Sequence, residues 1–158
     1  MPAEPAKRAP LLDDVMMVLS ALERHGVIYA LLGGVAMAVH GFPRMTKDID
    51  CIFPRDPENN ARLMAAIEDI SKKVRLDYLP QKEWLDKGYS TAAEGEIGID
   101  ILFVAASKEF GDYEIHIEER EISGVKVRVL DIEGMLMSKD TDRAEDIADR
   151  KRLSRLKG

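Results

Sequence analysis

A short apolar run that ends in two adjacent glycines constrains the fold of this chain more than any other segment. Residues 27–32 are continuously apolar and are followed by Gly33-Gly34. A continuous run, unlike an alternating one, is typical of a strand buried on both faces, which needs strands beside it and helices above and below it. Residues 35–40 then have the pattern of a short helix. The segment therefore predicts an internal strand of a sheet with helices packed on it.

The rest of the chain continues this alternation of helices and strands. Helices are expected where apolar residues recur at helical spacing, and strands where short apolar or alternating runs are bounded by glycine or proline. The resulting fold class is α/β (α+β): a central mixed β-sheet flanked by helices, with a helical C-terminal tail. The expected elements are helices over 11–25, 35–40, 58–72 and 131–156, strands over 27–32, 48–53, 74–79, 97–103 and 125–130, and a loop with at most one helical turn over 81–91.

Composition supports one domain with a hydrophobic core. The chain has 158 residues, 46% of them apolar and 33% charged, which excludes disorder of the whole chain. Residues 1–10 are rich in proline and are expected to form a disordered tail, so that 11–158 make up the domain. The single cysteine, Cys51, is expected in the core and fits a reducing compartment. Apolar runs are shorter than the roughly 20 residues that span a bilayer, so we expect a cytoplasmic protein without a membrane segment.

Two acidic residues, Asp48 and Asp50, are separated by a single residue in the strand expected over 48–53. Alternate side chains of a strand point to the same face, so these two carboxylates lie close together and Ile49 points to the other face. Two such carboxylates repel each other and raise each other's pKa unless a cation lies between them. The pair therefore indicates half of a site for a hard divalent cation.

A third acid, Asp100, interrupts the otherwise apolar strand expected over 97–103. Burying an unpaired carboxylate is costly, so something must compensate its charge. If this strand is a neighbour of strand 48–53, three carboxylates meet at one place. Gly98, on the same face as Asp100, then leaves open space beside them that suits a substrate.

Each of these features also has a purely structural explanation. Asp48 can pair with Arg44 or Lys47, Asp100 can accept a structural hydrogen bond, and the glycine pair can form a tight turn that needs positive φ. The same turn, between a strand and a helix, can instead bind an anion such as phosphate, because free backbone N–H groups and the helix dipole favour negative charge there. The presence of the glycine turn, the D-x-D pair and a later lone acid in one chain favours a functional site.

Together these residues resemble the nucleotidyltransferase superfamily related to DNA polymerase beta. Its signature is a Gly-Gly or Gly-Ser turn, a D-x-D pair and a later carboxylate. A fuller string from the glycine turn to the D-x-D pair is similar to the small bacterial group associated with abortive-infection and toxin–antitoxin systems. The resemblance covers about residues 11–156 and implies the nucleotidyltransferase fold. The matching strings are Leu32-Gly33-Gly34-Val35-Ala36, then Arg44-Met45-Thr46-Lys47-Asp48-Ile49-Asp50, and Ile99-Asp100-Ile101.

The resemblance also implies a role for each residue of the signature. Asp48 and Asp50 are expected to hold one or two Mg²⁺ ions, and Asp100 to be a further metal ligand or the general base. Gly33 and Gly34 are expected to cradle the phosphates of a nucleoside triphosphate such as ATP. The implied reaction is a metal-assisted displacement at the α-phosphorus by a hydroxyl, which depends mostly on positioning and electrostatics.

Three further residues are candidates for nucleotide binding. Arg44 and Thr46 precede the D-x-D pair, where a guanidinium either reaches a phosphate or pairs with an aspartate. The C-terminal segment resembles the tail of the same group, in which a lysine, here Lys139, reaches the nucleotide. Lys139 shares a helical stripe with Ile132 and Leu136, so its stem is expected to pack inward. A lysine that merely extends from a helix end is the alternative.

Charged residues near the C-terminus are expected to be structural. Asp146 and Arg150 have the i,i+4 spacing of an exposed acid–base pair, and Arg143 and Asp149 share their helical spacing. Residues 150–157 are basic and could meet RNA, although a solvated helix end is the more common case. The net charge of −6 and the acidic segment 105–122 argue against a broad nucleic-acid groove.

The sequence thus favours a Mg²⁺-dependent nucleotidyltransferase that transfers a nucleoside monophosphate to a hydroxyl of a protein, an RNA or a small molecule. Transfer to an aminoglycoside-like drug is a second enzyme hypothesis. The alternative is an inactive nucleotide-binding or protein-interaction module with the same fold. An antitoxin is the partner that the resemblance implies. The acceptor is expected to be held by segments 80–95 and 105–122, by a partner protein or by a second copy in a homodimer.

Overall fold

The protein is described by a computed structural model over residues 6–157. The first half of the predicted N-terminal tail, residues 1–5, lies outside this range, and residues 6–10 have neither helical nor strand structure. The elements in chain order are α1 (Leu12–Arg24), β1 (Ala30–Leu32), α2 (Gly33–Val39), β2 (Asp48–Ile52), α3 (Pro57–Ser71), β3 (Leu76–Tyr78), α4 (Lys82–Asp86), β4 (Thr91–Gly95), β5 (Gly98–Leu102), β6 (Val104–Ala105), β7 (Lys108–Glu109), α5 (Phe110–Tyr113), a 3₁₀ turn (Glu114–His116), β8 (Ile117–Ile122), β9 (Val125–Leu130), α6 (Ile132–Ser138) and α7 (Ala144–Leu156).

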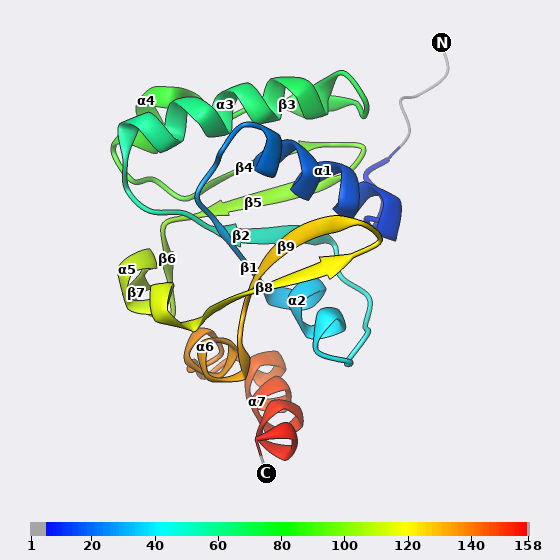
Figure 1. The fold of residues 1–158 in the computed structure, drawn as a ribbon, viewed down its shortest axis with the longest axis vertical. Coiled ribbons are helices and arrows are strands. Elements are labelled where there is room, and N and C mark those ends of the chain that lie inside the picture. Colours follow the sequence, from blue (N-terminus) through cyan, green and yellow to red (C-terminus); the bar gives the residue numbers. More distant parts are fainter. Residues whose placement is uncertain (1–5, 158) are drawn as a thin grey trace.

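The predicted central mixed β-sheet is confirmed. Seven strands form it in the order β3-β4-β5-β2-β1-β9-β8, and β6 and β7 form a separate small ribbon (Figure 1). The strand β1 runs antiparallel to β2 and parallel to β9, and β2 runs parallel to β5. The remaining neighbours are antiparallel. The two strands that carry the predicted acids are therefore adjacent in the middle of the sheet.

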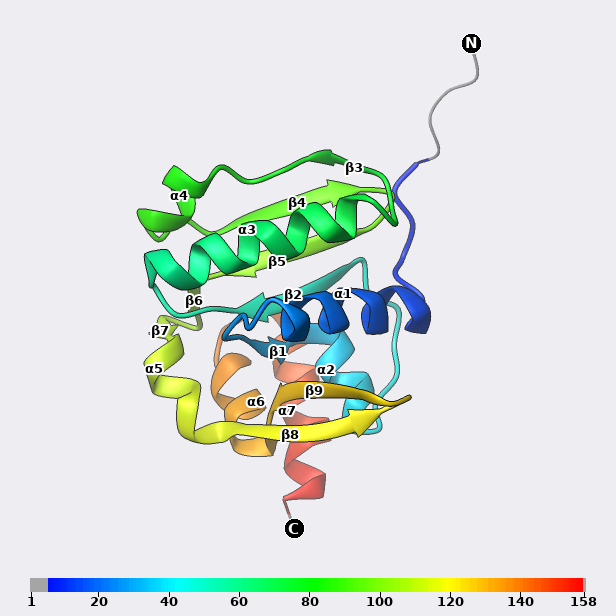
Figure 2. The same cartoon turned by 45° about the horizontal axis from the view of Figure 1, so that its top comes forward.

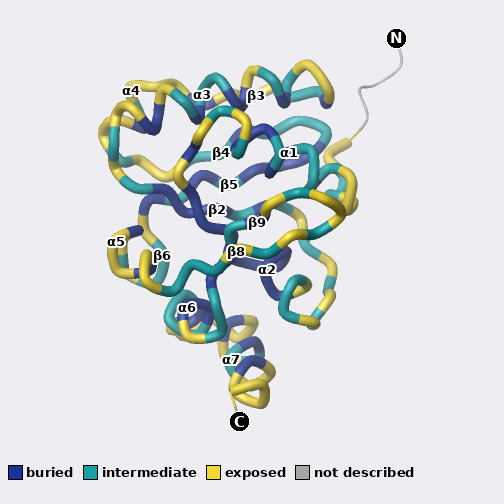
Figure 3. Tube along the Cα trace, in the orientation of Figure 1, coloured by how far each residue is buried: buried dark blue, intermediate teal, exposed yellow. Residues whose placement is uncertain are grey.

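Helices cover the sheet on both faces. The helices α1 and α3 contact each other and lie in front of the sheet in Figure 2, whereas α6 and α7 lie behind it. The helix α2 contacts β1 and β2. The central strands are the most deeply buried part of the backbone trace, and exposed residues lie in the connecting loops and on the outer sides of the helices (Figure 3). No helix within residues 6–157 is long and apolar enough to cross a membrane.

Local sequence signals explain where the long helices begin. Asp56 precedes α3, its carboxylate accepts a hydrogen bond from the Glu58 backbone N–H, and Pro57 occupies the first helical position. The carboxylate of Asp14 in the first turn of α1 accepts a hydrogen bond from the Leu11 backbone N–H. Both helices begin within one residue of the predicted position.

Several predicted boundaries and loops need correction. The strand β1 is shorter than the predicted 27–32, and β3 is shorter than 74–79. Segment 80–95 is not a loop, because it contains α4 and the strand β4, and segment 105–122 contains β7, α5 and β8. The C-terminal tail is two helices separated by residues 139–143. Pairing with β5 explains β4, whose own sequence, Thr-Ala-Ala-Glu-Gly, has little strand preference.

Candidate functional site

The three predicted acids meet on one face of the sheet. The strands β2 and β5 pair in parallel with Asp48 opposite Gly98 and Asp50 opposite Asp100. Because side chains alternate along a strand, Asp48, Asp50 and Asp100 all leave the same face. Cys51, which follows Asp50, points to the opposite face and is fully buried, as predicted.

Glycines make room for these carboxylates. A Cβ atom at Gly33 would lie 2.1 Å from Oδ2 of Asp50, and the φ of this glycine is +75°. A Cβ at Gly98 would lie 2.1 Å from Oδ1 of Asp48. Any larger residue at either position would have to displace a carboxylate. The space predicted beside Asp100 is therefore occupied in part by the Asp48 carboxylate.

A cavity of about 420 Å³ opens beside the carboxylates. Every residue that the sequence analysis selected for the site lies on its wall, from the glycine turn, the segment before β2, the two acidic strands and the end of α6. Arg143, Glu145 and Asp146 close the cavity from the side of α7. The residues selected from the sequence that line it are Gly33, Gly34, Arg44, Thr46, Asp48, Asp50, Asp100 and Lys139.

The neighbouring carboxyl group of Asp100 disfavours the ionisation of Asp50, whereas the hydrogen bond between the two favours the ionised form of Asp100. Burial, followed by the hydrogen bond and the negative charge of Asp100, raises the pKa of Asp50, and the nearby Lys139 ammonium opposes that rise. Burial is also the largest cause of the raised pKa of Asp100. Oδ1 of Asp50 is buried without a hydrogen-bond partner. In the free protein, therefore, the pair holds a proton more readily than an exposed carboxylate does.

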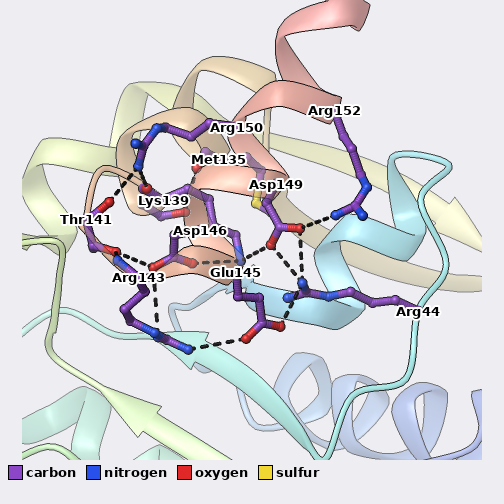
Figure 4. A network of polar contacts seen from close by, with 11 residues as sticks. Arg44, Met135, Lys139, Thr141, Arg143, Glu145, Asp146, Asp149, Arg150 and Arg152 are labelled. Carbon is purple, nitrogen blue, oxygen red and sulfur yellow. Dashed lines mark hydrogen bonds and ion pairs between the residues drawn. The ribbon is translucent and has the colours of Figure 1, made fainter.

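Lys139 connects this pair to a second group of acids on α7 (Figure 4). It ends α6, is only 5% exposed, and its Nζ lies 3.0 Å from Oδ2 of Asp149 and 3.6 Å from Oδ1 of Asp146. The side chain also lines the cavity. Both parts of the expectation for Lys139 are thus met in geometry: the stem is buried and the ammonium group reaches the cavity wall.

Arg44 pairs with an aspartate, but not with one of the D-x-D pair. Its Nη1 lies 2.9 Å from Oδ2 of Asp149 and 2.7 Å from Oε1 of Glu145. Thr46 holds the start of β2, because its hydroxyl donates to the backbone carbonyl of Asp48 at 3.0 Å. Both side chains also approach Gly34 closely. They therefore fix the segment between α2 and β2 against the cavity.

Asp146 and Asp149 form internal ion pairs with Lys139, in line with the structural role expected of them, but Asp146 does not form the expected pair with Arg150. They are 5% and 0% exposed, so they are not members of a solvated surface. Asp146 accepts a hydrogen bond from the Thr141 hydroxyl at 2.5 Å, and Arg150 donates to the backbone carbonyls of Lys139 and Thr141 instead of forming the expected i,i+4 pair. One signal was available in the sequence. Both acids share a helical stripe with the fully buried Leu153.

The first member of the D-x-D pair has a partner that the sequence analysis missed. Asp48 forms an ion pair with Lys7 in the N-terminal segment, and not with Arg44. Within residues 6–157, no three acid, histidine or cysteine side chains already form a metal cage. The donor set still fits a hard divalent cation, because the buried free oxygen of Asp50 and the adjoining carboxylates of Asp48 and Asp100 are oxygen ligands of the kind that Mg²⁺ prefers.

Solved structures with the same arrangement of elements are known. The antibiotic-resistance factor ANT(2'')-Ia is 19% identical, with 92% of this chain and 83% of that chain covered and a TM-score of 0.61. The lincosamide antibiotic adenylyltransferase LnuA, solved with lincomycin, is 18% identical over 93% of this chain and 98% of that chain, with a TM-score of 0.62. A putative nucleotidyltransferase from Thermotoga maritima, TM1012, is 14% identical over 92% and 89%, with a TM-score of 0.55. At these identities the likeness establishes the nucleotidyltransferase fold.

Sequence comparison gives the family. No curated protein matches the chain significantly. A family model described as nucleotidyl transferase AbiEii toxin, type IV toxin–antitoxin system, matches residues 18–140. The match contains the glycine turn, the D-x-D pair, Asp100 and Lys139, which line the cavity, and ends before Arg143, Glu145 and Asp146 on its α7 side. The chain therefore belongs to the AbiEii nucleotidyltransferase toxin family.

Proposed function

We propose that this protein transfers a nucleoside monophosphate from a nucleoside triphosphate to a hydroxyl group, with Mg²⁺ as cofactor. The observation that carries the proposal is the pairing of Asp50 with Asp100 in adjacent strands, next to Asp48 and below the glycine turn. A half-buried carboxyl pair in which one oxygen is buried without a hydrogen-bond partner is destabilising in its ionised form unless a cation binds it. Membership of the AbiEii nucleotidyltransferase family supports a role for that cation in nucleotidyl transfer.

In this proposal, some of the side chains bind the metal ion and others bind the nucleotide. Asp48 and Asp50 hold Mg²⁺, which when bound neutralises phosphate charge and stabilises the leaving pyrophosphate. Asp100 accepts the proton of the attacking hydroxyl, a role for which its raised pKa is suited. Lys139 directs an ammonium group toward the cavity where phosphate oxygens bind. The closely packed turn at Gly33 and Gly34 lets the phosphates approach the backbone.

Arg44 and Thr46 contribute by position. Arg44 joins the segment before β2 to α7 through Asp149, and Thr46 orients the first residue of β2. Their side chains lie on the cavity wall, so a bound triphosphate contacts the same surface that they hold in place. Loss of either side chain is expected to weaken nucleotide binding less than loss of the carboxylates.

The experiment is isothermal titration calorimetry of ATP, GTP, CTP and UTP, with and without Mg²⁺. The native protein is compared with Asp48→Asn/Asp50→Asn, and the matched control is Asp13→Asn/Glu83→Gln, which removes the same charge from two exposed positions on α1 and α4. We expect Mg²⁺-dependent binding of at least one nucleotide by the native protein and the control. The double variant at the site should lose it by about 100-fold or more, since two charged ligands are removed.

Two outcomes contradict the proposal. Equal nucleotide binding by the site variant and the native protein would show that Asp48 and Asp50 do not take part in binding. Absence of binding by a folded native protein would favour the alternative of an interaction module that has the fold without the activity. Nucleotide binding without release of pyrophosphate, in the presence of every acceptor class, would also favour that alternative.

The acceptor and the partner follow from the family and the structural relatives as proposals. Membership of a type IV toxin–antitoxin family makes an antitoxin the proposed partner. A protein or an RNA is the proposed acceptor, and a small molecule is the second candidate because ANT(2'')-Ia and LnuA, whose fold this chain shares, are named for antibiotics. Incubation with radiolabelled nucleotide, separately with cell protein, cell RNA, tobramycin and lincomycin, distinguishes these acceptors by which fraction is labelled.

A further inference from the structure

The N-terminal segment is held against the acidic face of the sheet by contacts that the proposed reaction does not use. The backbone N–H of Arg8 donates to the carbonyl of Glu96 at 2.9 Å. Its guanidinium pairs with Glu96 at 2.8 Å and with Asp14 at 2.6 Å, so that it links the turn between β4 and β5 to the first turn of α1. Arg8 therefore fixes the position of its neighbour, Lys7.

Lys7 extends from this anchor to the carboxylates. Its Nζ forms an ion pair with Oδ1 of Asp48 and lies 2.9 Å from Oε1 of Glu94 in β4. The same nitrogen lies 2.8 Å from the position that a Cβ of Gly98 would occupy. Gly98 is the residue opposite Asp48 in the β2–β5 pair. The ammonium group thus lies directly against the first residue of the D-x-D pair.

The ammonium group of Lys7 compensates the negative charge of Asp48, which a bound metal ion would otherwise compensate. Coordination by Oδ1 of Asp48 requires that Lys7 first leave that oxygen, because a divalent cation and an ammonium group repel each other at such a distance. The side chain of Lys7 is 33% exposed and that of Asp48 is 24% exposed, so the pair is partly hydrated and easily exchanged. The anchor at Arg8 keeps the local concentration of the ammonium group high.

We propose that Lys7 is an intramolecular competitor of the metal ion, which lowers the affinity of the acidic site for divalent cations until the cation displaces the N-terminal segment from Asp48. This inference rests on the proposed function, because it assumes that Asp48 is a metal ligand. It assigns the N-terminal segment an inhibitory role in the free protein. The opposite role, in which Lys7 helps to bind the metal–nucleotide complex, predicts the opposite effect of its removal.

The test uses Mn²⁺ alone as the probe and the full chain throughout. Free Mn²⁺ is measured by electron paramagnetic resonance during titration of the native protein and of Lys7→Gln, Lys7→Arg and Asp48→Asn/Asp50→Asn. Lys73→Gln, at an exposed lysine beyond the end of α3, is the matched control. We expect Lys7→Gln to bind Mn²⁺ about 2- to 5-fold more tightly, which is the size of effect expected for the loss of one exposed ion pair. Lys7→Arg and Lys73→Gln should bind like the native protein.

A second measurement follows the lysine itself. Acetylation of Lys7 by acetic anhydride, quantified by mass spectrometry, should become faster when Mn²⁺ is bound, because the amine then leaves Asp48. The rate at Lys73 should not change. This measurement does not depend on any enzymatic activity. If the metal binds where we propose, Mn²⁺ should not change the acetylation rate of Lys7 in the double aspartate variant.

The outcomes separate this inference from the proposed function. If the native protein binds Mn²⁺ and the double aspartate variant does not, but Lys7→Gln binds it equally or more weakly, the competition is disproved and the metal site stands. If Mn²⁺ binding survives the double aspartate substitution, or if no variant binds Mn²⁺, the metal site and the competition are disproved together. Tighter binding by Lys7→Gln with faster acetylation in Mn²⁺ supports both.

Discussion

Two clusters of aspartates lie close together in this protein, and their charges are compensated in different ways. On α7, Asp149 contacts Lys139 and Arg44, and Asp146 contacts Lys139 (Figure 4). On the strands, the other cluster consists of Asp48, Asp50 and Asp100. Within residues 6–157, no ammonium or guanidinium group forms an ion pair with Asp50 or Asp100.

The difference distinguishes an internal structural ion pair from a site prepared for an external ligand. A buried carboxylate with a fixed cation has its partner in the chain and contributes to the position of the helix that carries it. A half-buried carboxylate without one has a raised pKa, as Asp50 does. Lys139 belongs to both clusters, because it pairs with the helix acids and favours the charged form of Asp50. The two clusters should therefore respond to mutation with opposite signs.

The largest effect is expected from breaking the helix cluster. Asp149→Ala leaves the buried Lys139 and the half-buried Arg44 with fewer partners, and we expect the free energy of unfolding to fall by about 3 to 5 kcal/mol. Urea denaturation followed by circular dichroism measures this. The control on the same helix is Glu145→Ala, which removes a half-exposed partner of Arg44 and should cost about 1 kcal/mol or less. Equal losses for the two variants would contradict the assignment of Asp149 as a structural partner.

The next effect has the opposite sign. Asp50→Asn replaces a carboxyl group that folding must keep protonated by a group that is neutral at every pH, so in metal-free buffer near neutral pH we expect the free energy of unfolding to rise by about 1 to 2 kcal/mol. The measurement is urea denaturation in the presence of a chelator. Asp13→Asn, at an exposed position of α1, controls for the change in net charge and should have little effect. A clear loss of stability in Asp50→Asn would mean that the ionised carboxylate has a favourable partner.

The pH dependence of the same pair of proteins sharpens the comparison. The pKa of Asp50 is raised in the folded state, so folding favours its protonated form. This contribution to stability is fully present below the ordinary carboxyl pKa of about 4 and is lost as pH rises toward the raised value of about 8. The gain in unfolding free energy of Asp50→Asn over the native protein should therefore grow from about pH 4 to about pH 8 and vanish in acid. A difference that is constant with pH would contradict the raised pKa.

The smallest effect is the response to metal. Mg²⁺ binds only the folded site, so a concentration about ten times its dissociation constant should raise the melting temperature of the native protein by about 2 to 4 °C. Asp48→Asn/Asp50→Asn should show no such rise. Glu145→Ala, which leaves the strand cluster intact, should respond like the native protein. Differential scanning calorimetry measures all three, and an equal rise in the double variant would place the ion elsewhere.

How far the sequence predicts the site depends on which cluster is considered. The spacing of Asp48 and Asp50 in a strand was enough to place both on one face, and Asp100 was visible as a charge in an apolar run. Asp146 and Asp149 were expected to be structural, with Asp146 in an i,i+4 pair with Arg150, because acids and bases at helical spacing are typical of such pairs. Their helical stripe with Leu153 indicates a buried face, but their partners Lys139 and Arg44 follow from the packing of α7 against the rest of the molecule, which no local pattern expresses.

Lys7 shows the same limit at the other end of the chain. A proline-rich segment without apolar residues at regular spacing predicts a loose tail, and residues 6–10 do lack helix and strand. The contacts of Lys7 and Arg8 are with Asp48, Glu94 and Glu96, which are distant in sequence. Such contacts depend on where β4 and β5 lie in the sheet, and β4 itself was not predicted.

The sequence by itself determined the local properties of this protein: which segments are apolar enough to be buried, where glycine interrupts them, and which face of a strand carries the acids. These depend on the 2.0 and 3.6 residue periods of strand and helix, which operate over a few neighbours. The tertiary structure alone decided that β2 lies beside β5, that Lys139 meets Asp149, and that Lys7 reaches Asp48. Strand order and ion pairing between distant segments are set by the packing of the whole core, because a charge is stabilised by whatever surrounds it in space and not by its neighbours in the chain.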